Sequence, residues 1–211
     1  MSDNNYWIKF WKEHGNATRD ADEQTQVLRT SNKKPVSPEL WQFTLQGIED
    51  QIQIGPSDTL LELCSGNGLI SRHFASFCSQ VTAVDVSSDL LAPIEASLRE
   101  NIRTIASDIR DVDFEPESFS RVIIYAGIQY FTLAETIALF EKVYRWLTPG
   151  SIFFLGDVPD SRKRWVFYDS IERERIYFDN AKENRDIIGT WFDPELWESF
   201  LLMWDLAGVT L

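Results

Sequence analysis

The sequence has little cysteine and little histidine, which limits the chemistry it can support. Its 211 residues include two cysteines, Cys64 and Cys78, and two histidines. Two cysteines are too few for a disulfide scaffold, and they show neither the CxxC nor the Cys/His spacing of a zinc site. We therefore expect no metal ion, and the composition is compatible with a reducing compartment.

The sequence also lacks a long apolar run and a secretory signal. No uninterrupted apolar stretch approaches the roughly 20 residues that span a bilayer. Residues 1–5 (MSDNN) lack the positive region and apolar stretch of a signal peptide. The hydrophobic fraction of 44% and the charged fraction of 25% are near globular averages. These features predict a soluble chain with no membrane partner, located in the cytoplasm.

Positive charge is in deficit. The 20 Lys and Arg residues stand against 33 Asp and Glu residues, which gives a net charge of −13 at pH 7. A surface with this charge repels a phosphate backbone at long range. We therefore expect a small-molecule partner and no nucleic acid.

Short β-rich runs alternate with amphipathic helical patterns from Ser57 onward. This alternation is typical of βαβ units and predicts an α/β fold with a doubly wound, mainly parallel sheet and flanking helices. We expect strands over 59–63, 81–84, 102–106, 121–125 and 152–155, and helices between them over 69–77, 89–100 and 133–147. Pro149 and Gly150 are expected to end the last of these helices.

The chain divides into three predicted parts. Residues 1–56 form a helical lid or cap segment, with helices over 6–14 and from Pro38, capped by Ser37, to about Gln53. Residues 57–158 form the α/β core. Residues 159–211 form a helical insertion, rich in charges and aromatics, and a final helix over 195–206 that ends at Gly208. The aromatic segments 6–11 and 165–168 are expected either to cover a bound ligand or to pack in the core.

The most informative motif is LLELCSGNG, residues 60–68, in which a strand runs directly into a glycine-bearing turn. Gly66 and Gly68 lack a Cβ, so a ligand can approach the main chain closely. Glu62 precedes the turn, and Asp85 ends the next strand, 17 residues after Gly68. A carboxylate at the end of that strand can accept the protons of both ribose hydroxyls. The combination favours a nucleoside site, although each residue alone has an ordinary reading as a turn or cap.

Over roughly residues 58–157, the sequence resembles the Rossmann-like (class I) methyltransferases that depend on S-adenosylmethionine, in particular the small-molecule branch. A weaker similarity continues over 191–208. The resemblance implies S-adenosylmethionine as the cofactor, with S-adenosylhomocysteine as the product. It also implies methyl transfer to a small polar metabolite or sugar-like acceptor.

The resemblance assigns roles to the residues at the predicted strand ends. Glu62 and the turn would hold the methionine part of the cofactor, Asp85 the ribose, and Asp108 the adenine amino group. The full set of expected cofactor-binding residues is Glu62, Cys64, Ser65, Gly66, Asn67, Gly68, Asp85, Val86, Ser87, Asp108, Ile109, Tyr125, Ala126 and Gly127.

Two residues depart from the family pattern. Cys64 stands where the turn usually has its first glycine, and Ser120 stands where an aspartate often precedes the fourth strand. We expect Cys64 to have ordinary dihedrals and to serve as a small packing residue rather than a nucleophile. His73 lies within a predicted helix and is expected to be structural.

Several alternatives remain open. A nicotinamide dinucleotide is the rival cofactor, but Ser71 replaces the third glycine of its fingerprint, and Glu62 would repel a pyrophosphate while attracting the ammonium group of S-adenosylmethionine. A catalytically silent module that binds the cofactor and acts through a protein partner is a second alternative. If the acceptor is a hydroxyl, the candidate bases are Asp157, Tyr130 and His14.

The sequence contains three residues after Gly208, whereas the family's sheet usually has two further strands there. We therefore expect a sheet without these last two strands. Its fifth strand, with Phe153 and Phe154, would then lie at an uncovered edge. Exposed edges pair readily, so self-association through this edge is a prediction that light scattering can check.

Overall fold

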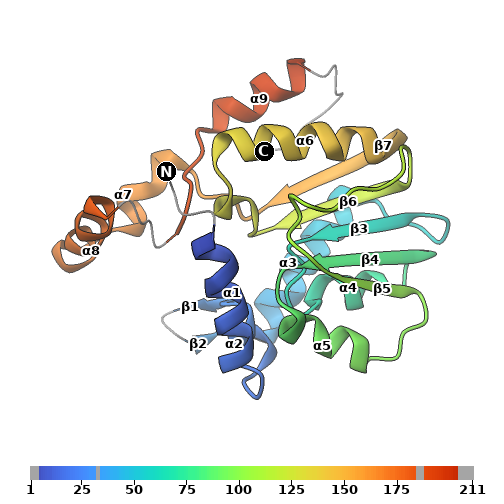
Figure 1. Cartoon of the computed structure of the whole chain (residues 1–211), viewed down its shortest axis with the longest axis horizontal. Helices are drawn as coiled ribbons and strands as arrows, with labels where there is room; N and C mark the ends of the chain where they lie inside the picture. Colours follow the sequence, from blue (N-terminus) through green and yellow to red (C-terminus); the bar gives the residue numbers. More distant parts are fainter. Residues whose placement is uncertain (1–4, 32–33, 184–187, 204–211) are drawn as a thin grey trace.

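The computed structural model describes residues 5–31, 34–183 and 188–203 (Figure 1). Its centre is a five-stranded sheet with the order β5-β4-β3-β6-β7, in which all neighbouring strands are parallel. The strands are β3 (Thr59–Leu63), β4 (Gln80–Asp85), β5 (Ile102–Ala106), β6 (Phe119–Tyr125) and β7 (Leu147–Gly156). This architecture confirms the predicted α/β class, and the predicted bounds of β3 and β5 match.

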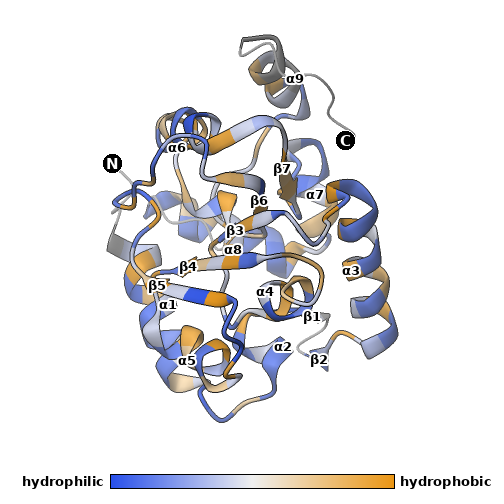
Figure 2. Ribbon diagram, turned by 90° about the vertical axis from the view of Figure 1, so that its right-hand side faces the viewer, coloured by the Kyte–Doolittle hydropathy of each residue, from blue (hydrophilic) through white to orange (hydrophobic). Residues whose placement is uncertain are grey.

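Helices cover both faces of the sheet, because alternate residues of each strand are apolar on both sides. The face that includes Leu60 and Val81 packs against α3 (Pro38–Ile52), α4 (Leu69–Phe74) and α5 (Ser88–Ala96). The face that includes Leu61 and Val122 packs against α6 (Leu133–Trp146) and α9 (Pro194–Met203). Figure 2 shows that the strands are largely apolar while the outer sides of the helices are polar. The sheet is therefore doubly wound.

Local signals in the sequence set several helix boundaries. Ser37 Oγ accepts the backbone N–H of Leu40 at 3.2 Å, and Pro38 opens α3, as predicted. α6 ends at Trp146, before the Pro149-Gly150 pair, and β7 begins at once with Leu147 rather than at residue 152. Because β7 is an edge strand, it tolerates a proline that cannot donate to a neighbouring strand.

The capping box of α6 provides a test of local stability. Thr132 Oγ1 accepts the N–H of Glu135, and Glu135 Oε2 accepts the N–H of Thr132 at 2.8 Å. Thr132→Ala should lower the free energy of unfolding by about 1 kcal/mol, because one helix-end donor loses its partner. Urea denaturation measures this change. Thr44→Ala, at an exposed position within α3, is the control and should change stability by less than about 0.5 kcal/mol.

The N-terminal segment lies across the α/β core. It contains α1 (Asn5–Ala17), α2 (Glu23–Gln26) and a short hairpin of β1 (Thr30–Ser31) and β2 (Lys34–Pro35) that was not predicted. Arg19 pairs with Asp89 of α5 at 2.5 Å, and Asn16 donates to the same carboxylate at 3.4 Å. These contacts hold the end of α1 against α5.

Beyond β7, η2 (Ser161–Lys163), α7 (Arg164–Phe167) and α8 (Ile171–Lys182) form an arm that projects away from the sheet (Figure 1). Its aromatic residues pack on one another; for example, the rings of Trp165 and Tyr177 lie 5.3 Å apart. The chain then returns to the core, where Thr190 N donates to Gln129 O at 2.7 Å. A helical insertion is confirmed over most of residues 160–183. The predicted end of the last helix, at residues 204–208, lies outside the described residues.

β7 lies at one edge of the sheet, and no strand of the described ranges pairs with its outer side. Its faces are covered: the Phe153 ring packs on Phe140 at 5.0 Å, and Phe154 packs on the cluster beneath α3. Self-association through the open edge stays a prediction. No helix of the described part is both long and apolar enough to cross a membrane.

Candidate functional site

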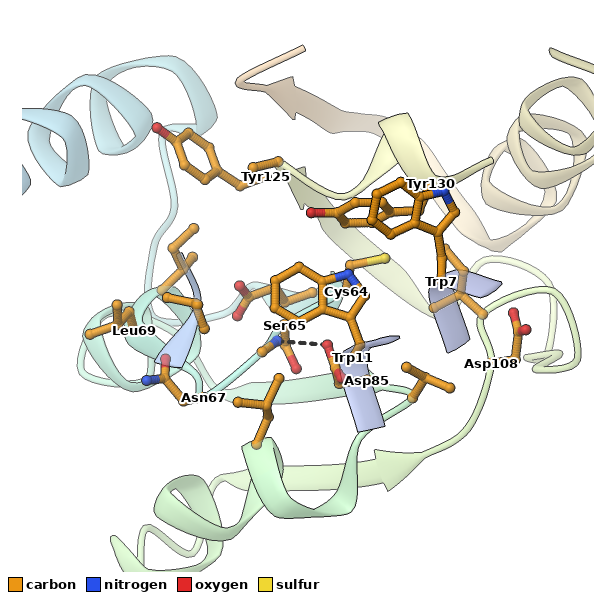
Figure 3. A pocket seen from close by; sticks show the side chains of 18 of the residues that line it. Trp7, Trp11, Cys64, Ser65, Asn67, Leu69, Asp85, Asp108, Tyr125 and Tyr130 are labelled. Atoms are coloured by element: carbon orange, nitrogen blue, oxygen red, sulfur yellow. Dashed lines mark hydrogen bonds between the residues drawn. The ribbon is translucent and has the colours of Figure 1, made fainter. Parts of the chain in front are cut away.

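A cavity of about 850 Å³, counting its open mouth, lies at the carboxyl ends of the strands (Figure 3). Most of the predicted site residues line it, although they come from four different strand ends. These are Glu62, Cys64, Ser65, Gly66, Asn67, Asp85, Val86, Asp108, Ile109, Tyr125, Ala126 and Tyr130. The structure thus brings together what the sequence separates, at the edge where open parallel sheets bind ligands.

Three predicted residues lie just behind the lining and shape it. Gly68, with φ +74°, is the N-cap of α4, and Ser87 Oγ caps α5 by accepting the N–H of Leu90 at 3.4 Å. A Cβ on Gly127 would lie 2.5 Å from Cys64 Cβ, so only glycine allows this close packing. These positions organise the cavity wall rather than forming its surface.

Asp85 joins the glycine turn to the next strand. Its Oδ2 accepts the N–H of Gly66 at 2.8 Å, and its Oδ1 accepts the N–H of Ser87 at 2.9 Å (Figure 3). Burial raises the pKa of Asp85 to about 6, although these backbone donors act in the opposite direction. A carboxylate offers about four acceptor positions, so each oxygen keeps one for a ligand.

Three polar atoms in the lining are buried and have no hydrogen-bond partner among the described residues: Ser65 Oγ, Asn67 Oδ1 and Trp11 Nε1. Unsatisfied buried polar atoms are rare and costly, and a polar ligand would satisfy them. The turn itself is tight, because a Cβ on Gly66 would lie 2.7 Å from a methyl group of Val27. The cavity therefore suits a ligand that has both donors and acceptors and approaches the main chain closely.

Glu62 lies at the floor of the cavity and is only 3% exposed. Its carboxyl group accepts a hydrogen bond from the Ser71 hydroxyl, the position where a dinucleotide fingerprint has its third glycine. Burial raises the pKa of Glu62 to about 8. The side chain is therefore mostly protonated at neutral pH, and a cationic ligand group would favour its ionised form.

Cys64 corrects one expectation. Its φ is +57°, in the left-handed region, whereas ordinary dihedrals were expected. The position thus keeps the backbone conformation typical of the missing glycine, and the side chain lines the cavity. Burial, with Asp85 as the next cause, raises the pKa of the thiol well above its usual value. The thiol therefore stays protonated, consistent with packing rather than nucleophilic chemistry.

Asp108 lines the far side of the cavity and is held by Arg110. Its Oδ1 accepts the backbone N–H of Arg110 at 2.9 Å, and both carboxylate oxygens accept the guanidinium Nε–H at 3.0 Å. Burial alone would raise the pKa of Asp108, but the bonds from Arg110 hold it below its usual value. Arg110 also pairs with Glu135 at 2.7 Å. The role of Asp108 toward an adenine stays a prediction.

The three candidate bases have different positions. Tyr130 lines the cavity, and burial raises the pKa of its hydroxyl, so it remains a phenol at neutral pH. Asp157 lies outside the lining, one ion pair away through Arg29. His14 also lies outside, with Nε2 3.1 Å from the carbonyl oxygen of Gln26. Of these three, only the Tyr130 side chain reaches the cavity surface.

Other lining residues were not assigned from the sequence, notably Arg29, Trp41 and Arg110. The aromatic segment 6–11 does reach the cavity, because Trp7 and Trp11 lie four residues apart on one face of α1. By contrast, segment 165–168 contributes no residue to the lining. Cover by that segment is therefore wrong, and its side chains pack within the arm instead.

The comparisons with known proteins concern the same part of the chain. Residues 60–150 match the family described as "Methyltransferase domain". The α/β core is a Rossmann-like, class I methyltransferase domain. The match spans β3 to the start of β7 and includes the glycine turn, Asp85 and Asp108.

A relative and two solved structures illustrate how far the likeness of the methyltransferase domain extends. The chain is 31% identical over 116 residues to the carboxy-S-adenosyl-L-methionine synthase of Psychrobacter arcticus, covering 51% of this chain and 42% of the synthase. The fold resembles phosphoethanolamine N-methyltransferase 1 of Haemonchus contortus, in complex with phosphoethanolamine and S-adenosylhomocysteine, with a TM-score of 0.61 and 14% identity over 70% of this chain and 31% of that one. A putative methyltransferase of Bacillus halodurans gives 0.59 and 21% over 75% and 67%. At these identities, the two structures show the fold alone.

Proposed function

We propose that this chain binds S-adenosylmethionine at the cavity and transfers its methyl group to a small polar acceptor. The observation that carries the proposal is the group of buried polar atoms without partners, Ser65 Oγ, Asn67 Oδ1 and Trp11 Nε1, beside a left-handed glycine turn. The methyltransferase family of residues 60–150 supports the same cofactor rather than a nicotinamide dinucleotide.

The residues of the cavity fit the parts of this cofactor. Asp85 would accept the ribose hydroxyls, and Glu62 would face the ammonium group of the methionine part. The glycine turn allows the close approach that both contacts require. Val86, Asp108 and Ile109 would enclose the base. When bound, the cofactor supplies an electrophilic methyl group on a sulfonium that already carries its leaving group.

On the acceptor side, the chain's own residues would position the acceptor and exclude water. Trp7 and Trp11 pack on Tyr130, with ring centroids 4.7 and 5.5 Å from it, and these rings form one wall of the cavity (Figure 3). A dry wall keeps bulk water from competing with the acceptor. The Tyr130 phenol would donate a hydrogen bond, and Asp157 would receive a proton if the acceptor is a hydroxyl.

The acceptor class rests on charge. The net charge of −13 disfavours a nucleic acid, and the polar and aromatic lining suits a small metabolite or sugar-like molecule. The chain spans 42% of the length of the Psychrobacter synthase, so the activity of that whole protein does not transfer. A ribosomal RNA methyltransferase of Moorella thermoacetica, 34% identical over 65 residues, makes RNA the alternative for the test.

The test combines binding with methyl release. Calorimetry with S-adenosylhomocysteine should show micromolar binding, whereas a nicotinamide dinucleotide should give no heat. Incubation with methyl-tritiated S-adenosylmethionine should then label a small-metabolite extract rather than total RNA. Heat with the dinucleotide alone would overturn the cofactor, and labelling confined to RNA would overturn the acceptor class.

A silent binding module is a second candidate, favoured by the exposed apolar side chains of the arm. Val166, Ile171 and Phe178 are all more than half exposed on α7 and α8. Patches of this kind often contact a protein partner. Binding of S-adenosylhomocysteine without methyl release to any extract would support this second function.

A further inference from the structure

Arg29 is a nearly buried cation in the wall of the cavity. It directly precedes β1, its side chain is 17% exposed, and it belongs to the lining. The guanidinium lies over the Tyr125 ring, 4.3 Å from its centroid. Its Nη2 donates to the Tyr125 carbonyl oxygen at a long 3.4 Å, and its Nη1 donates to Asp157 Oδ2 at 2.6 Å. One short bond therefore holds a group that has five N–H donors.

The partner of this bond is not part of the cavity. The Asp157 side chain is 55% exposed and lies outside the lining, whereas Arg29 lies within it. An ion pair with one solvated member contributes little free energy, and water readily replaces its exposed partner. The contact is therefore suited to exchange.

The other cation in the lining differs from Arg29 in this respect. Arg110 is held by Asp108 and Glu135, and these two acids are largely covered. Among the residues that line the cavity, Arg29 is thus the cation whose charge is balanced from outside. An anionic group of a ligand would meet an oriented, desolvated guanidinium there.

We propose that Arg29 is an oxyanion receptor, and that a carboxylate or phosphate of the bound ligand takes the place of Asp157 on the guanidinium. Parallel N–H donors of a guanidinium match the two oxygens of such a group, and the Tyr125 ring fixes the plane of the fork. Release of Asp157 to water costs little, since its side chain is already more than half exposed. This inference rests on the proposed function, because it assumes that the cavity holds a ligand.

The position of Arg29 defines two sources for the anion. Its contacts are Tyr125, at the end of β6, and Asp157, just after β7, whereas Asp85 ends β4 on the opposite side of β3. The anion therefore lies away from the ribose. It belongs either to an acidic acceptor or to the amino-acid end of the cofactor.

The first arm of the experiment tests the cofactor as the source. Calorimetry compares S-adenosylhomocysteine with 5′-methylthioadenosine, which lacks the amino-acid end, in the wild type, Arg29→Gln, Asp157→Asn and a control, Arg162→Gln. Arg162 is 68% exposed on the arm. If the cofactor supplies the anion, Arg29→Gln weakens S-adenosylhomocysteine at least tenfold and leaves methylthioadenosine within twofold. Asp157→Asn then strengthens S-adenosylhomocysteine up to about fivefold, because the competing carboxylate is gone.

The second arm tests the acceptor. Methyl-labelled products of a metabolite extract are separated on an anion exchanger. If the acceptor supplies the anion, wild type and Arg162→Gln label the retained fraction, and Arg29→Gln labels it at least tenfold less while binding both nucleosides normally. Unchanged nucleoside affinities together with unchanged labelling in Arg29→Gln overturn the inference. A wild type that binds neither nucleoside overturns the proposed function itself, and the inference with it.

Discussion

Asp85→Asn is expected to lower the affinity for S-adenosylhomocysteine at least about 100-fold. Both oxygens of Asp85 already accept a backbone N–H, from Gly66 and Ser87, and the remaining lone pairs would receive two ribose hydroxyls. Hydrogen bonds to a charged group contribute about 1.5–3 kcal/mol each, so the loss of two corresponds to two or more factors of ten. Calorimetry at pH 8 measures this loss with the carboxylate ionised, because the pKa of Asp85 is about 6.

The same substitution also affects the fold, and the experiment must separate the two effects. An asparagine presents one N–H₂ to a backbone donor, which lowers the free energy of unfolding by about 1–3 kcal/mol. A 2′-deoxyribose analogue of the ligand completes a double-mutant cycle. Wild type and the exposed control Asp179→Asn should prefer the ribose form, and Asp85→Asn should bind both forms equally. An undiminished preference in Asp85→Asn would show that Asp85 only organises the turn.

The sequence was sufficient to predict the fold wherever a signal is local. β3 and β5 match their predicted bounds, because each is a short apolar run between turn residues. β7 was predicted five residues too short, since Pro149 and Gly150 usually interrupt a strand, and its position at the sheet edge is not visible locally. The hairpin of β1 and β2 was missed for a similar reason: each strand has only two residues.

The site shows the same division. Glu62, Gly66 and Asp85 were found because strand order alone brings the carboxyl ends together. Arg29 was not assigned, because its contact with Asp157 joins residues 128 positions apart. The conformation of Cys64 was also missed. The turn requires a left-handed residue there, and a side chain gives no sign that it accepts the strain.

Glu62 should make cofactor binding depend on pH. Burial raises the pKa of Glu62 to about 8, so at pH 7 the ligand-free chain is mostly protonated at this site. Binding an ammonium group favours the carboxylate and releases a proton. The affinity for S-adenosylhomocysteine should therefore rise between pH 6.5 and 8, by at most about tenfold per pH unit. Calorimetry in two buffers of different ionisation enthalpy should detect the release of up to one proton at pH 7.

Glu62→Gln keeps the shape and the acceptor for Ser71 but cannot ionise, so its affinity should be nearly flat over this range and about tenfold below wild type at pH 8. His14 titrates nearby, which is why this variant, rather than the wild-type profile, decides the assignment; Glu13→Gln, exposed on α1, is the control. The free energy of unfolding should change in the opposite direction. The native pKa is raised, so the ligand-free wild type is stabilised below pH 4.5 and loses that stability as pH approaches 8, whereas Glu62→Gln does not. If affinity and stability changed with pH in the same direction, the buried carboxyl group would not be the group that ionises on binding.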